Sequence, residues 1–74
     1  MDAITQGARM SGGYVFIIDS DGHRHAIRAT AVTVLSDADI IHDETVLQIG
    51  GGRTLRVPVG LDEVLSWFQL GPSR

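Results

Sequence analysis

The 74-residue chain contains neither cysteine nor lysine. The lack of cysteine excludes disulfides and thiolate zinc sites, and it is consistent with a reducing compartment. A domain this small has a marginal balance of stability, and oligomerisation is the usual reinforcement when disulfides and structural metals are missing. We therefore expect a homo-oligomer.

The chain also lacks a long apolar run. No stretch approaches the ~20 apolar residues that a membrane span needs. The N-terminus has neither the basic segment nor the apolar run of a secretory signal. These absences predict a cytoplasmic protein with no membrane partner.

Positive charge is scarce and scattered. The formal net charge is −3, from nine acidic residues against six arginines. Nucleic-acid binding generally needs a clustered basic surface, because neutralisation of phosphates supplies most of the affinity. We therefore do not expect nucleic acid as a partner. A nucleic-acid-binding regulator stays open as an alternative, and it would need four arginines on one surface: Arg24, Arg28, Arg53 and Arg56.

Hydrophobic residues make up 43% of the chain, which is typical of a folded protein. Residues 1–12 show no sustained periodicity and are predicted to form a flexible N-terminal tail. Residues 13–70 are predicted to form a single α+β domain. Residues 71–74, which begin with Gly-Pro, are expected to form a short C-terminal tail.

The stretch DSDGHRH, residues 19–25, follows a β-branched and aromatic run that predicts a strand over residues 14–18. Asp-Gly within it is a strong hairpin signal, so a second strand is expected over residues 23–29. A two-residue turn would pair Asp19 with Arg24. Asp19 would then lie on the face opposite His23 and His25, because directly opposed residues share a face.

Three further short strands and a glycine run follow. Residues 32–35 predict a third strand and residues 36–39 a turn, while residues 40–43 are ambiguous and could extend into the next strand. Residues 45–49 and 53–59 flank Gly-Gly-Gly as a second hairpin. A three-residue loop is preferred there, because it sets Leu47 opposite Leu55 and uses glycine at positive φ. Pro58 should close the strand or lie on an edge.

A helix is predicted over residues 61–70. Asp62 and Glu63 lie in its first turn, and the Gly-Pro that follows is expected to end it. Its apolar stripe comprises Leu61, Val64, Leu65 and Phe68. The predicted fold is therefore α+β: a small antiparallel sheet of four or five strands, with two hairpins and one C-terminal helix. A small five-stranded β-barrel is the alternative.

The histidines are the candidate ligands for a metal ion. His23 and His25 would point the same way from one strand, with Asp19 and Asp21 nearby, and only His42 remains as a third imidazole. A zinc or iron site needs three or four converging protein ligands. A turn with histidines at the rim of an apolar face, and no ligand, is the favoured interpretation. We therefore expect no cofactor and no metal. No serine lies in a nucleophile elbow, and we do not expect an enzyme.

Apolar surface left over by the predicted fold is the main functional signal. The predicted fold leaves more apolar surface than one helix can cover. This surface comes from Val15 and Ile17 on the second face of the first strand and from Trp67 and Leu70 off the helix stripe. Either other strands fold over them or they form an interface anchored by Trp67. The predicted function is a non-enzymatic regulatory or adaptor protein that binds protein as a homodimer. A metal- or small-ligand-binding module using the histidines is a further alternative.

The order strand, Asp-Gly turn, strand, short strand, then TVLQIGGGRTLRVPVGLDEVLSWF, resembles the small flagellar FlbD-type proteins and, more loosely, one half of a LytTR domain. Both have a strand, a glycine-containing turn, a strand, and a helix that opens as residues 59–63 do here. The resemblance covers residues 13–69 and implies a small regulatory protein. It transfers no functional residues. The segment over residues 36–44 is longer than the corresponding segment of these families. The basic residues that a LytTR module directs at DNA are not evident.

Overall fold

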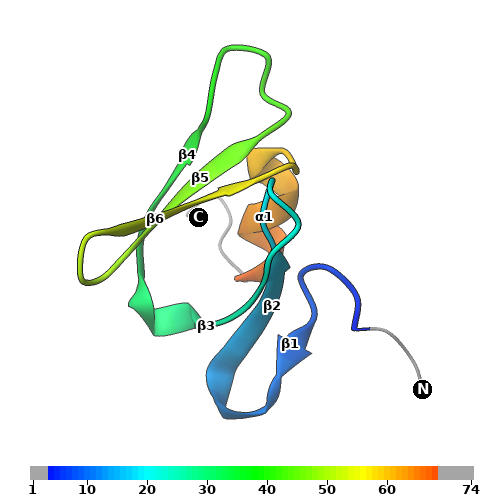
Figure 1. Cartoon of the computed structure of the whole chain (residues 1–74), viewed down its shortest axis with the longest axis vertical. Coiled ribbons are helices and arrows are strands. Elements are labelled where there is room, and N and C mark those ends of the chain that lie inside the picture. Colours follow the sequence, from blue (N-terminus) through cyan, green and yellow to red (C-terminus); the bar gives the residue numbers. More distant parts are fainter. Residues whose placement is uncertain (1–3, 69–74) are drawn as a thin grey trace, which may run out of the picture.

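The computed structural model describes residues 4–68 of the chain (Figure 1). Within this range it has two short 3-10 turns, at residues 11–13 and 29–31. The strands and the helix are β1 (Arg9–Met10), β2 (Tyr14–Ile18), β3 (Arg24–Arg28), β4 (Val32–Asp37), β5 (Thr45–Ile49), β6 (Arg53–Val57) and α1 (Leu61–Trp67).

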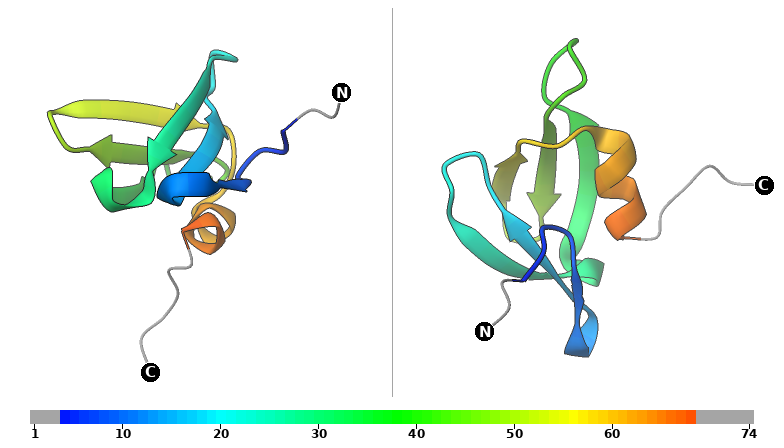
Figure 2. Two further views of the ribbon diagram at one scale, coloured as in Figure 1. Left: turned by 90° about the horizontal axis from the view of Figure 1, so that it is seen from below. Right: turned by 90° about the vertical axis from the view of Figure 1, so that its right-hand side faces the viewer.

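The strands form two antiparallel sheets, in the orders β1-β2-β3 and β4-β5-β6, and α1 packs beside β4. Figure 2 shows the two sheets crossing each other with the helix at one side of them. The α+β class with two hairpins and a C-terminal helix is confirmed. The barrel alternative is wrong, because the two sheets stay separate. The described strands number six rather than four or five.

The first hairpin has a different register from the predicted one. Ile18 pairs with Arg24 and Val15 with Ile27. The Asp19 N–H donates to the His23 carbonyl at 2.9 Å, and residue 22 is a glycine at φ 85°, so residues 20–22 form a three-residue loop. A shift of one residue moves every side chain to the other face. Asp19 therefore shares a face with both histidines, and its predicted pairing with Arg24 is wrong.

The second hairpin follows the sequence prediction. Leu47 lies opposite Leu55, as expected for a three-residue loop. Gly51 and Gly52 have φ values of 94° and 82°, a region that glycine adopts without a steric penalty. β6 ends directly before Pro58, which is consistent with the missing backbone donor of proline.

β4 is longer than predicted. It extends through Asp37, so the first half of the expected turn at residues 36–39 is strand. Residues 38–44 then form the loop to β5, closed by a hydrogen bond from the Ala38 N–H to the Glu44 carbonyl at 3.0 Å. We call residues 38–44 the tip loop. It projects beyond the sheets at one end of the molecule (Figure 1).

Residues 4–12 of the expected N-terminal tail are part of the fold, and residues 1–3 lie outside the described range. β1 pairs with β2, and the Gly7 N–H donates to the Phe16 carbonyl at 2.8 Å. The Gln6 amide binds both backbone groups of Ile18: Nε2 donates to the carbonyl at 2.8 Å, and Oε1 accepts from the N–H at 2.6 Å. Residues 4–10 thus cover one edge of β2.

The core lies between the two sheets and the helix. Val64 and Phe68 on the predicted stripe are buried, and so is Trp67, which was placed off the stripe. The helix ends at Trp67 with Phe68 as its C-cap, and residues 69 and 70 of the predicted helix lie outside the described range. The connected core cluster contains Val15, Ile17, Ile27, Leu47, Leu55, Val57, Val64, Trp67 and Phe68.

No helix in the described part of the chain is both long enough and apolar enough to cross a membrane.

The Gly7→Ala substitution tests the docking of the N-terminal segment. A Cβ at Gly7 would overlap the Trp67 ring, and the φ of 83° adds backbone strain. Gly22→Ala is the matched control, because its φ of 85° is the same kind of strain with nothing within 4 Å. Urea denaturation should show that Gly22→Ala costs about 1–2 kcal/mol and that Gly7→Ala costs a further ~1–3 kcal/mol from overpacking. Equal losses would contradict this packing.

Candidate functional site

The residues expected to form an interface are inside the single chain. Val15 and Ile17 have no exposed surface, and Trp67 is 8% exposed. The cover comes from the second sheet and α1, and Gly7 of the N-terminal segment packs against Trp67. Leu70, the fourth expected interface residue, lies outside the described residues. Val15, Ile17 and Trp67 therefore offer little or no surface to a partner in this structure.

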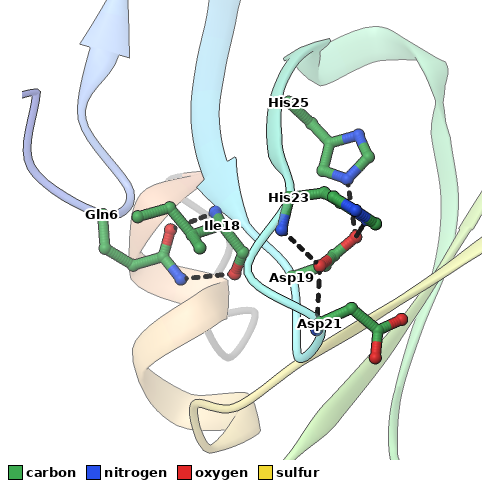
Figure 3. A network of polar contacts seen from close by, with 6 residues as sticks. All are labelled: Gln6, Ile18, Asp19, Asp21, His23 and His25. Atoms are coloured by element: carbon green, nitrogen blue, oxygen red, sulfur yellow. Dashed lines mark hydrogen bonds and ion pairs between the residues drawn. The ribbon is translucent and has the colours of Figure 1, made fainter.

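The hairpin between β2 and β3 gathers a cluster of polar groups around Asp19 (Figure 3). Asp19 Oδ1 accepts hydrogen bonds from the backbone N–H groups of Asp21 and His23, both at 2.9 Å. Asp19 Oδ2 lies 2.8 Å from His25 Nε2 and 3.8 Å from His23 Nδ1. Asp19 is therefore the acceptor that shapes the turn and holds the partly buried imidazole of His25.

The surroundings of Asp19 favour its ionised form. The hydrogen bond with His25 is the largest effect, and it lowers the pKa of the Asp19 carboxyl. Partial burial works in the opposite direction, while the backbone N–H groups of His23 and Asp21 lower the pKa further. The net result is a pKa below the usual range of an aspartate.

Three groups of this hairpin are placed to share a cation. Ligand atoms of Asp19, Asp21 and His23 all lie within 4.8 Å of one another, and Asp21 and His23 are exposed. His42 does not join them: its Nδ1 lies 3.0 Å from Asp37 Oδ2, at the base of the tip loop. The three candidate histidines do not converge, and the groups that do come together here are two carboxylates and one imidazole.

The tip loop combines apolar and acidic side chains. Ile40 is 91% exposed and Ile41 is 70% exposed. The loop is shaped by its own polar groups: Asp39 Oδ1 accepts a hydrogen bond from the Ile41 N–H at 3.0 Å, and His42 adopts a φ of 67°. The acidic residues of the loop and its base are Asp37, Asp39, Asp43 and Glu44. An apolar tip is therefore held out in solvent inside a negative rim.

Arginines gather at the edge of β3. Arg24, Arg28 and Arg53 line one cleft of about 410 Å³ beside β3 and β6, and among the described residues no carboxylate lines it. Arg56, the fourth arginine of the nucleic-acid alternative, instead donates from Nε to Glu44 Oε1 at 2.8 Å. Glu44 raises the pKa of the Arg56 guanidinium through this contact. Three of the four arginines thus share a surface.

A second hollow, of about 490 Å³, lies on the face of the β1–β3 sheet that points away from the core. We call this face the outer face. Ile4 and Met10 are exposed there, and Phe16 forms part of the lining. Arg24 lines this hollow as well as the arginine cleft. Apolar surface and positive charge are therefore adjacent on the outer face.

Sequence reasoning missed the tip loop as a candidate site. Its signal was present, because two adjacent isoleucines stand between acidic residues where no periodicity places them in a strand or helix. The outer face had no such signal, since its surface comes from the N-terminal segment pairing with β2.

No protein-family model, curated protein or solved structure matches the chain. The resemblance to FlbD-type and LytTR proteins therefore stays a prediction.

The contact between Asp19 and His25 can be tested by titration. In His25→Ala the pKa of Asp19, followed by carboxyl NMR shifts, should rise toward the ordinary value of about 3.9. His42→Ala is the matched control and should leave it unchanged, because His42 faces Asp37. The depressed folded-state pKa means that the Asp19 contribution to stability is fully present above the ordinary value and is lost as pH falls through the folded value. An unmoved pKa in His25→Ala would refute the contact.

Proposed function

We propose that the protein is a non-enzymatic binding module of the regulatory or adaptor kind, and that it contacts protein through the tip loop. The observation that carries this proposal is the exposure of Ile40 and Ile41 side by side at the end of a projecting loop. Contiguous exposed apolar surface is typical of interaction sites, and these two side chains are the most exposed of the large hydrophobic residues within residues 4–68.

The energetics of the tip support reversible binding. Burying an isoleucine side chain contributes about 1.5–3 kcal/mol, so the pair supplies ~3–6 kcal/mol before the cost of association. The hydrogen bond from the Ile41 N–H to Asp39 and the contact of His42 with Asp37 already shape the loop. Less ordering is therefore needed on binding, which favours affinity.

The hydroxyl groups support a non-enzymatic role. Ser20 Oγ lies 3.3 Å from Glu44, while Thr33, Thr45 and Ser66 donate to backbone carbonyls. Within residues 4–68 none of these hydroxyls bonds to a histidine. An activated serine or threonine nucleophile requires such a neighbouring base.

The double variant Ile40→Ser/Ile41→Ser tests the proposal. Its free energy of unfolding should stay within about 0.5 kcal/mol of the parent, because both side chains are exposed. Affinity capture from a lysate of the native organism, quantified by mass spectrometry, should recover specific proteins with the parent chain and lose them with the double variant.

Val34→Ser is the matched control, because Val34 is an exposed apolar residue of β4 outside the tip loop. It should retain the captured proteins. Recovery of the same proteins by the double variant would rule out the tip as the contact element.

A second candidate function is the binding of a divalent transition-metal ion at the hairpin. The grouping of Asp19, Asp21 and His23 favours it, since imidazole and carboxylate together suit ions such as Zn²⁺ and Ni²⁺. The hydrogen bond from His25 would then orient the Asp19 carboxylate, as outer partners of metal ligands commonly do.

Thermal unfolding with Zn²⁺ or Ni²⁺ tests this second candidate. Binding to the folded state raises Tm with ligand concentration, and His23→Gln should abolish the rise. His42→Gln should leave the rise intact, because His42 lies beside Asp37. A Tm that is the same with metal, without metal and after addition of a chelator would rule out this site.

A further inference from the structure

We propose that a second copy of this chain is a partner of the tip loop, and that the tip of one copy docks on the outer face of the other. This inference rests on the proposed function, because it names an occupant for the same tip. It also assigns a receiving surface, which combines the hollow lined by Ile4, Met10 and Phe16 with the neighbouring Arg24.

The exposed apolar residues are concentrated on these two surfaces. Within residues 4–68 five large hydrophobic side chains are exposed, and four of them belong to the tip or to the outer face. Ile40 and Ile41 form the tip, while Ile4 and Met10 flank the hollow. Docking one surface on the other would cover four of the five large hydrophobic side chains that are exposed within residues 4–68.

The charges of the two surfaces are complementary. The tip loop and its base carry Asp37, Asp39 and Asp43 besides Glu44, which pairs with Arg56. Asp62 and Glu63 of α1 line a cavity together with Asp37. The outer face presents Arg24 and Arg28, and no carboxylate lies within ion-pair distance of either among the described residues. Opposite potentials speed encounter and fix orientation.

The two surfaces cannot meet within one chain. The tip loop projects from one end of the molecule, and β1 lies at the other end (Figure 1; Figure 2, right). The hollow is an open depression in the surface, so apolar side chains of a narrow loop can lie against it. A projecting tip reaches such a hollow on a second copy without the bodies of the sheets having to interpenetrate.

Each copy carries both halves of the contact, which determines the assemblies that can form. A reciprocal exchange about a two-fold axis closes a dimer, whereas a one-way contact adds further copies. In either case the contact depends on apolar burial at the tip and on ion pairs at its rim. Salt should therefore weaken it, because exposed ion pairs are screened.

Sedimentation of the full chain over a concentration series, at low and at high salt, tests the inference. At low salt the weight-average mass should rise from 8.0 kDa with concentration, and high salt should shift the rise to higher concentration. Ile40→Ser/Ile41→Ser and Arg24→Glu should each remain at the monomer mass. Val34→Ser should associate as the parent does, since Val34 lies on neither surface.

Exchanging the charges of the two surfaces between two variants tests the docking more specifically. Asp43→Arg reverses a charge at the rim of the tip and keeps the hydrogen bond from the Ile41 N–H to Asp39 that shapes the loop, and Arg24→Glu reverses the receiving face. Each variant alone should be monomeric, while their equimolar mixture should associate. Circular dichroism of every variant should match the parent, because all these side chains are exposed.

The inference is overturned by a parent chain that stays at the monomer mass, by association that survives the tip variant, or by failure of the mixture to associate. A monomeric parent that still captures proteins through Ile40 and Ile41 overturns this inference alone and leaves the proposed function standing. A monomeric parent that binds a labelled single-stranded oligonucleotide, and loses it in Arg24→Glu, would assign the outer face to nucleic acid instead.

Discussion

The packing of the Trp67 indole against Gly7 is the contact on which the rest of the structure depends. Trp67 ends α1 and Gly7 precedes β1, so this contact joins the two ends of the described chain, and there is no room for a Cβ between them. The Arg9 guanidinium adds a hydrogen bond to the Trp67 carbonyl at 3.3 Å. With the N-terminal segment in place, β2 is paired on both sides and Val15 and Ile17 are fully buried. A chain of this size without disulfides needs such complete use of its apolar residues.

This closed core determines where binding can occur. Because the inner sheet faces are used internally, the large apolar side chains left exposed within residues 4–68 are those of the tip loop and the outer face, together with Val34 of β4. The charged side chains are also separated between two regions of the surface. Acidic side chains gather around the tip and the start of α1, while Arg24, Arg28 and Arg53 gather beside β3. The binding role and the self-association that we propose both follow from this separation of charge on a fully packed body.

The sequence predicted the elements whose signals are local. The second hairpin has the expected register, because the pairing of Leu47 with Leu55 follows from alternation and loop length alone, and α1 begins at the expected residue. The first hairpin was misread because Asp-Gly suits both two- and three-residue loops, and one residue of difference moved Asp19 from the side of Arg24 to the side of His25. The N-terminal segment was missed because a glutamine that binds the backbone of Ile18 leaves no periodic pattern.

The most direct measurement of the central claim, that the chain covers its own core and binds through what remains, is an isotope-filtered NOE experiment on a mixture of labelled and unlabelled copies. The structure predicts intramolecular contacts between Gly7 and the Trp67 indole, together with intermolecular contacts from the Ile40 or Ile41 methyl groups to the Met10 methyl group. Intermolecular contacts from Trp67, with none from either isoleucine, would contradict the account.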